Sequence, residues 1–340
     1  MTDSLLASPL PLVAAPMAGG LSTISLAKAV ASAGGFAFLA GGYKTAEALA
    51  EDIEQLRESV PDFGVNLFVP SEDQVAEAAF AAYASLLADE AGAYGLDLDA
   101  RPVVDDDGWR EKLGVLTEQP VAVVSFTFGL PDRSDIALLQ GVGTKILATV
   151  TTPGEALQAW QVGVDGLVEQ GPRAGGHSAT FDPTRLIEDS STADLVRAVR
   201  GEVDLPIIAA GGVDGPGAVH ELLLAGAEAV AVGTLLMRTD EAGTSVTHRQ
   251  ALGDAAFTET ILTRVFTGRP ARALRNGFID RYQQAAVNAY PAVHHLTRAL
   301  RQAAGKAGDA DRLNLWAGTG WRKSVTGPAA EVIRSLAEGV

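Results

Sequence analysis

The chain has 340 residues, of which 47% are hydrophobic and 20% are charged, and its mean hydropathy is +0.15. This is the composition of a globular protein with enough apolar material for a large core. The formal net charge of -16 argues against nucleic acid as a partner. Cysteine is absent, which excludes disulfides, thiolate nucleophiles and cysteine-based metal or iron–sulfur sites.

The first residues are apolar, but they do not have the pattern of a signal peptide. They lack a basic segment, carry Asp3 and are interrupted by Pro9 and Pro11. No apolar run in the sequence approaches the roughly 20 residues that a membrane helix needs. We therefore expect a cytoplasmic protein that does not associate with a membrane.

Short apolar runs alternate with longer segments of helical composition from residue 12 to about residue 240. The apolar runs predict eight buried strands, at residues 12–15, 36–40, 63–68, 121–126, 144–150, 164–169, 206–210 and 229–233. The clearest helices are predicted at residues 22–33, 45–59, 71 to about 89, 153–161, 192–201 and 216–225. Ser22 is the expected N-cap of the first helix. A proline opens the helices predicted at residues 153–161 and 216–225.

Eight repeats of strand and helix predict an α/β fold, a closed parallel TIM (β/α)8 barrel. An open doubly wound sheet has the same local pattern, but the number of repeats and the late glycine turns favour the barrel. Residues 91–119 are polar and are interpreted as an inserted segment after the third strand. Residues 1–240 are thus expected to form the barrel, and residues 241–340 a helical extension packed near its mouth.

The working groups of such a barrel lie in the loops after the carboxyl ends of the strands. Gly211 and Gly212 follow the seventh predicted strand, and Gly233 and Thr234 follow the eighth. Glycines here expose backbone N–H groups, which together with a helix N-terminus form a phosphate cradle. A single glycine turn of this kind more often serves only to let the chain turn tightly, without binding a ligand. As a pair of loops they favour phosphate binding, although the phosphate can belong to a cofactor or to a substrate.

His177 is the candidate catalytic residue. It directly follows Gly175 and Gly176 after the sixth predicted strand, and glycines let the backbone approach a flat ligand closely. An ordinary imidazole suits either proton transfer or hydrogen bonding to an anion. The alternative role is a turn histidine that caps a loop. The other histidines lie on predicted helices or outside the barrel and are interpreted as structural or solvated: His220, His248, His294 and His295.

Metal and hydrolase sites find no support in the sequence. Neither H-x-x-x-H nor H-E-x-x-H spacing occurs, and Asp105–Asp107 is interpreted as a solvated charge run. The G-x-S-x-G elbow of serine hydrolases is absent as well. We therefore expect no metal site.

Several segments, in the same order, resemble the bacterial nitronate monooxygenases, formerly called 2-nitropropane dioxygenases. They are residues 15–20 (APMAGG), 33–43 (AGGFAFLAGGY), 63–70, 170–177, 206–234, 263–276 (TRVFTGRPARALRN) and 290–300. The resemblance covers essentially the full length. It implies a barrel that binds FMN without a covalent bond.

The resemblance also implies roles for individual residues. Pro16 and Met17 would line the flavin, and Asn66 and Gln170 would hydrogen-bond it. Gly175 and Gly176 would allow close backbone approach. The phosphate would be held by Gly211, Gly212, Gly233 and Thr234. His177 matches the catalytic histidine of the family.

The implied reaction is oxidation of an alkyl nitronate by O₂ to a carbonyl compound and nitrite, with propionate 3-nitronate as the suggested substrate. Arg173 stands where many members have an acidic residue. It either adds positive potential for an anionic substrate or points outward. Tyr290, Trp316 and Trp321 are candidates for the wall of the substrate pocket or, as the commoner role, for core packing.

Two other functions remain open on the sequence. Flavin-dependent enoyl-acyl-carrier-protein reductases share this barrel and a similar Ala-Gly-Gly-His turn, but they use NAD(P)H. The segments at residues 15–20 and 264–272 favour the nitronate enzymes. A barrel that binds a phosphorylated metabolite without flavin also fits the glycine turns.

Overall fold

The computed structural model describes residues 5–71 and 75–340. Eight parallel strands form a closed barrel, as expected, and β1 pairs with β9 to complete the ring. The strands of the barrel are β1 (Leu12–Ala14), β2 (Phe36–Ala40), β3 (Gly64–Phe68), β4 (Val123–Thr127), β5 (Lys145–Val150), β6 (Gly166–Gln170), β8 (Ile207–Ala210) and β9 (Ala229–Val232). Each predicted strand is found at or within a few residues of its expected place.

Large apolar side chains fill the interior of the barrel below the carboxyl ends of its strands. This interior is therefore a packed core rather than a channel. Phe36, Phe38, Leu147 and Ile208 meet there and are at most 3% exposed. Leu5, from the N-terminal segment, belongs to the same cluster. Because the lower interior is filled, a ligand has room only toward the carboxyl ends of the strands.

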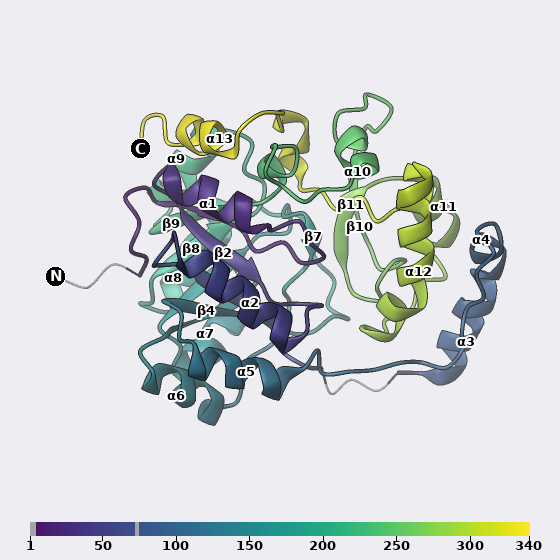
Figure 1. Cartoon of the computed structure of the whole chain (residues 1–340), viewed down its shortest axis with the longest axis horizontal. Helices are drawn as coiled ribbons and strands as arrows, with labels where there is room; N and C mark the ends of the chain where they lie inside the picture. The colour runs from purple at the N-terminus through teal and green to yellow at the C-terminus, as the bar shows by residue number, and fades with distance from the viewer. Residues whose placement is uncertain (1–4, 72–74) are drawn as a thin grey trace.

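Helices surround the barrel and bury their apolar faces against the strands (Figure 1). They are α1 (Ile24–Ser32), α2 (Ala46–Arg57), α5 (Trp109–Glu118), α6 (Arg133–Gly141), α7 (Pro153–Val162), α8 (Thr192–Glu202), α9 (Pro216–Leu224) and α13 (Ala329–Leu336). The last of these comes from the end of the chain and packs against α1 and α9. After β9 only a short 3-10 turn, η1 (Thr234–Leu236), follows directly, so α13 takes the place of the eighth helix.

Three expectations for the helices are corrected. The N-cap of α1 is Thr23, whose hydroxyl accepts a hydrogen bond from the N–H of Leu26, and not Ser22. The barrel helix that follows β3 is α5, which lies within the segment interpreted as an insertion and packs between α2 and α6. The helix expected from residue 71 is instead α3 (Glu77–Leu86), followed by α4 (Ala88–Gly92); residues 72–74 lie outside the described residues.

Helices α3 and α4 lie away from the barrel, beside the region that follows residue 240 (Figure 1). Phe80 and Tyr83 of α3 form a second core with Phe266 and Phe278. The hydroxyl of Tyr83 donates to the carbonyl of Val265, which fixes this arrangement. The sequence alone did not reveal this packing, because the contacts join segments about 180 positions apart.

The region after residue 240 contains helices, as expected, and also two strands that were not. The helices are α10 (Val246–Ala251), α11 (Gly277–Tyr282) and α12 (Ala292–Ala307), with the 3-10 turns η2 (Ala310–Arg312) and η3 (Thr319–Lys323). The strands β10 (Thr260–Thr263) and β11 (Ala271–Leu274) form a small antiparallel sheet with β7 (Gly176–His177). We call residues 241–328 the cap. The small sheet connects this cap directly to β7, the strand that carries His177. No helix in the described part of the chain has the length and apolarity required to cross a lipid bilayer.

Candidate active site

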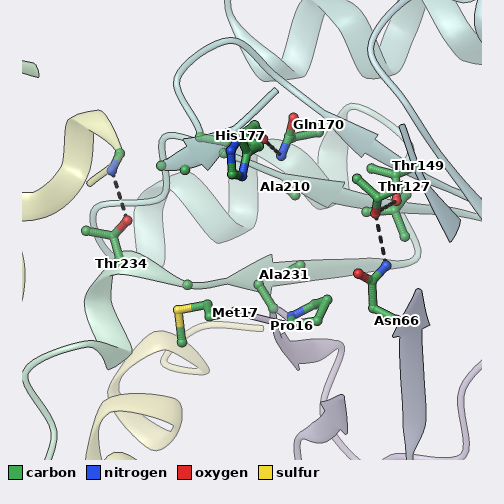
Figure 2. A pocket seen from close by; sticks show the side chains of 18 of the residues that line it. Pro16, Met17, Asn66, Thr127, Thr149, Gln170, His177, Ala210, Ala231 and Thr234 are labelled. Carbon is green, nitrogen blue, oxygen red and sulfur yellow. Dashed lines mark hydrogen bonds between the residues drawn. The ribbon is translucent and has the colours of Figure 1, made fainter. Parts of the chain in front are cut away.

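A cavity of about 220 Å³ lies at the carboxyl ends of the barrel strands, and it brings together the catalytic and cofactor-binding residues proposed from the sequence. Figure 2 shows how these residues converge from several strand ends. The proposed residues that line the cavity are Pro16, Met17, Asn66, Gln170, Gly175, Gly176, His177, Gly211, Gly212, Gly233 and Thr234. Its floor is apolar and includes Phe38, Ile208 and Ala231.

One end of the cavity is built from the loops after β8 and β9. Gly211 and Gly212 have φ angles of 109° and 78°, a region that favours glycine, so the turn requires them. A Cβ added at Gly233 would meet nothing nearer than 3.6 Å, where Ala15 and Met17 lie. A Cβ at Gly233 would therefore make only ordinary van der Waals contacts, so packing within the protein does not require glycine at this position.

The C-terminal segment completes this end of the site. The N–H of Gly318 donates to the hydroxyl oxygen of Thr234 over 2.9 Å, a bond drawn in Figure 2. Gly318 and Gly320 both line the cavity. A Cβ at Gly175 would lie 2.5 Å from the backbone nitrogen of Gly318. Glycine at position 175 is thus required by packing against this segment, in addition to any approach to a ligand.

The first-strand loop is fixed by a serine. The hydroxyl oxygen of Ser22 accepts the backbone N–H of Met17 over 2.9 Å, and the N–H of Ser22 donates to the carbonyl of Met17. These paired bonds hold residues 17–22 as a compact turn. Pro16 and Met17 consequently present a fixed apolar surface at the cavity, which suits contact with a flat ring.

Asn66 lies at the end of β3 with only 4% of its surface exposed. Its side-chain amide nitrogen donates to the Ser125 carbonyl, and to the hydroxyl oxygens of Ser125 and Thr127 at 2.9 Å each. Thr127 is in turn 3.3 Å from the hydroxyl of Thr149 (Figure 2). Because the protein uses the amide N–H groups, the amide oxygen is the atom that Asn66 offers to a donor on a ligand.

Gln170, at the end of β6, is bound mainly to the protein. Its amide nitrogen donates to the carbonyl of His177 over 3.1 Å, and its amide oxygen accepts the N–H of Ala179 over 2.8 Å. The side chain thus bridges β6 to the segment that carries His177. It positions that segment and retains one N–H for a ligand.

Aromatic rings enclose the imidazole of His177. The centroids of Trp316, Phe128 and Tyr290 lie 5.4, 5.6 and 5.7 Å from the imidazole centroid. Nε2 of His177 lies 2.9 Å from the hydroxyl oxygen of Thr267, ninety positions later in the chain. The ring is therefore held by a specific polar contact within an otherwise apolar surround.

Burial, together with the positive charges of Arg269 and Arg301, lowers the pKa of His177 to about 3. The imidazole is consequently neutral at physiological pH. Arg269 is 2% exposed and its guanidinium lies 4.0 Å from the ring centroid of Phe128. Arg301 donates to the carbonyl of His294 and to the hydroxyl of Thr297, which are both neutral. Burial lowers the pKa of Arg301 to about 10, so it stays charged near neutral pH.

The structure separates the remaining candidates. Arg173 points outward, where Nε contacts Asp189 over 3.0 Å and the side chain is 42% exposed. Trp316 lines the cavity, whereas Trp321 is buried in a separate core cluster. Asp107 is not simply a solvated charge: it pairs with the buried Lys112 over 2.8 Å. No group of acidic and histidine side chains in the described residues could hold a metal ion.

Several residues of the site were not selected from the sequence: Tyr43, Thr127, Phe128, Thr149, Thr267, Arg269, Gly318 and Gly320. Tyr43, Thr127 and Thr149 follow or end barrel strands, so the rule used for the other loops would have found them. Phe128 has a φ of 81°, which only the backbone reveals. Thr267, Arg269 and Gly318 come from the cap, and their sequence spacing gives no signal of this placement.

Comparisons with known proteins agree with this geometry. A family model described as nitronate monooxygenase matches residues 4–339. A probable nitronate monooxygenase of Staphylococcus aureus (strain Newman) is 30% identical over 331 residues, covering 96% of this chain and 93% of the relative. The solved nitroalkane oxidase of Streptomyces ansochromogenes is 45% identical, with a TM-score of 0.91 over 97% of this chain and 95% of that one. FabK of Thermotoga maritima is 25% identical, with a TM-score of 0.75 over 98% and 93% of the two chains.

Proposed function

Because the chain belongs to the nitronate monooxygenase family, we propose that it is an FMN-dependent enzyme that oxidises alkyl nitronates with O₂ to a carbonyl compound and nitrite. Propionate 3-nitronate is the substrate we would test first. The neighbouring nitroalkane oxidase, at 45% identity, supports a substrate of the nitroalkane class. The cavity supports both the cofactor and the charge of the substrate.

The cavity residues fit a flavin with a terminal phosphate. Glycine backbone at residues 211, 212 and 233, with the hydroxyl of Thr234, would hold the phosphate without a charged side chain. Pro16 and Met17 would contact the ring, and the amide oxygen of Asn66 would accept a ring N–H. When bound, the flavin supplies the electron acceptor for a carbanion-like substrate.

The observation that carries the proposal is positive potential in a cavity without carboxylates. No acidic side chain occurs among the described residues that line the cavity. After burial, the charges of Arg269 and Arg301 are the further causes that lower the pKa of His177. The field that disfavours a second positive charge on the imidazole equally favours an anion beside it. The site therefore suits a nitronate better than a neutral nitroalkane.

His177 acts in this site as a neutral imidazole. It can donate a hydrogen bond from one ring nitrogen to the oxygens of a nitronate, and this is the role that we assign to it. Thr267 fixes the ring through Nε2, and Gln170 fixes its backbone. The aromatic residues around the ring exclude water, which strengthens a hydrogen bond to an anion. The residues of this chain thus orient the substrate and stabilise its charge.

The test is anaerobic mixing of the purified yellow protein with propionate 3-nitronate, with 3-nitropropionate and with NADH, while the flavin absorbance is recorded. We expect the nitronate to bleach the flavin faster than 3-nitropropionate, in which the nitro group is not ionised. Bleaching by NADH alone would assign the protein to the reductases instead. A colourless protein would favour the phosphorylated-metabolite barrel.

We predict that His177→Asn retains the flavin but lowers kcat/KM for the nitronate by at least about tenfold, the scale of one catalytic hydrogen bond. The exposed histidine of α9 provides a matched control, and His220→Asn should leave the kinetics unchanged. Steady-state nitrite formation measures both variants. Equal kinetics of the two variants would remove His177 from the mechanism.

A further inference from the structure

A second cavity, of about 480 Å³, lies directly outside the first. Among the described residues, Tyr43 and Phe68 line both cavities and so form the partition between them. The outer cavity lies between the loop after β2, the loop that precedes α5 and the beginning of α12. A substrate whose reacting end lies beside His177 can extend further only past this partition.

The backbone holds Tyr43 in a restricted conformation. Its φ of 64° lies in the left-handed region, which a non-glycine residue adopts only when its surroundings require it. A Cβ added to the preceding Gly42 would lie 2.3 Å from the ring of Phe68. The loop can therefore pack on β3 at this distance only with glycine before Tyr43.

A partly buried ion pair holds the same loop from outside. Oδ1 of Asp107 accepts the backbone N–H of Tyr43 over 3.0 Å. Oδ2 of Asp107 contacts Nζ of Lys112 over 2.8 Å, and the Lys112 side chain is only 2% exposed. The segment before α5 thus fixes the position of the partition, although it contributes no residue to the inner cavity.

The aromatic ring of Tyr43 is held as well. It stacks on the imidazole of His294, with a centroid separation of 4.1 Å and an interplanar angle of 7°. Its hydroxyl oxygen accepts a hydrogen bond from the hydroxyl of Tyr290 over 3.1 Å. Backbone, ion pair, stacking and hydroxyl contact together make the ring a fixed wall rather than a mobile side chain.

The outer cavity suits an uncharged extension of the substrate. Phe68, Val69, Pro70 and Pro291 give it apolar surface. Its charged groups are mainly carboxylates, namely Glu47, Asp105, Asp106, Asp107 and Glu111, against Lys44 and Arg298. Lys44 is already paired with Asp52, and Nε2 of His295 contacts Asp105. A second anionic group on the substrate would meet net repulsion there.

We propose that Tyr43 determines substrate length: its ring confines short nitronates to the inner cavity, and the outer cavity is a binding subsite for an uncharged aliphatic tail. This inference rests on the proposed function, because it takes the reacting end to be a nitronate beside His177. Asp107 is a positioning residue, which acts through the backbone of Tyr43.

The test compares Tyr43→Ala with the matched control Tyr43→Phe, which keeps the ring. For each, kcat/KM is measured with the nitronates of nitroethane, 1-nitrohexane and 6-nitrohexanoate. We expect Tyr43→Ala to raise the ratio of hexyl to ethyl kcat/KM at least about tenfold over wild type, because four more methylene groups become buried. Tyr43→Phe should change this ratio less than about twofold. The terminal carboxylate of 6-nitrohexanoate should abolish the gain.

Asp107→Asn weakens the ion pair with Lys112 and should raise the ratio of hexyl to ethyl kcat/KM by about threefold. This variant tests the proposal if Tyr43→Ala does not fold. Calorimetric binding of nitroethane and 1-nitrohexane, without turnover, gives a second readout. If wild type oxidises no nitronate, the proposed function fails, while the binding ratio still tests Tyr43. Unchanged kinetic and binding ratios in Tyr43→Ala would overturn the inference, and an equal gain with 6-nitrohexanoate would overturn the assignment of an uncharged tail.

Discussion

Buried histidines should make this protein sensitive to mild acid. Burial lowers the pKa values of His177, His248 and His294 to about 3, 4 and 2, from an ordinary value of 6.5. His248 and His294 are 5% and 7% exposed, respectively. Because the folded-state pKa lies below the unfolded-state value, the unfolded chain binds more protons as the pH falls below 6.5. Stability that is present above pH 6.5 is therefore lost progressively toward pH 4.

The size of the effect follows from these values. At pH 5 the folded protein keeps all three rings mostly neutral, whereas the unfolded chain protonates them with a pKa of 6.5. The difference of about 1.5 pH units corresponds to roughly 2 kcal/mol for each ring. The three together would lower the free energy of unfolding by roughly 6 kcal/mol, a large share of a typical total.

His248 is the best position at which to measure this, because it lies outside the cavity and its Nε2 contacts the carbonyl of Trp316 over 3.0 Å. His248→Gln retains a donor but does not titrate. Urea unfolding of wild type, His248→Gln and the exposed control His220→Gln at pH 7.5 and pH 5 measures the loss. We expect the loss to be smaller by about 2 kcal/mol in His248→Gln alone. An equal loss in all three proteins would refute the reasoning.

Two further predictions concern a buried carboxyl and the end of the cavity that we propose to hold the phosphate. Glu169 is fully buried, both its oxygens lack a hydrogen bond, and burial raises its pKa well above the usual range. Because the folded-state pKa is raised, this carboxyl lowers the stability of the protein increasingly as the pH rises above 4.5. Glu169→Met should therefore raise the free energy of unfolding in urea by about 1–3 kcal/mol at pH 7.5, and by less at pH 5. A destabilised variant would contradict this. Gly233→Val should fold normally, since a Cβ there would make only ordinary van der Waals contacts with Ala15 and Met17, but it should release FMN on dialysis. Normal flavin affinity would place the phosphate elsewhere.

The barrel and the inner residues of the site could be predicted from the sequence because each rests on a local rule. Apolar runs of a few residues predict buried strands, and groups that follow such strands meet at one end of a parallel barrel. His177 and Gly233 were found in this way, although they lie in different repeats, whereas Asn66 was proposed from the family resemblance. The same rule applies to Tyr43, which follows β2, but composition alone did not distinguish it from a turn residue.

Features that depend on contacts across the chain could not be predicted in this way. The packing of α3 on the cap needs Phe80 to meet Phe266, and the closure of the helix layer by α13 needs the chain end to return to α1. Neither contact leaves a periodic signal in the sequence. The strands β10 and β11 are short, and each is defined by its partner rather than by its own residues.

The cap has a chemical consequence for the site. The loops of the barrel place His177 at a cavity, but they do not by themselves make it neutral or fix its ring. Thr267 contacts its Nε2, Trp316 covers one side, and the charges of Arg269 and Arg301 lower its pKa. All four residues come from the region after residue 240. In the proposed function the barrel would hold the cofactor. The cap contributes to the burial and to the charges that keep His177 neutral, and the same charges would favour an anionic substrate.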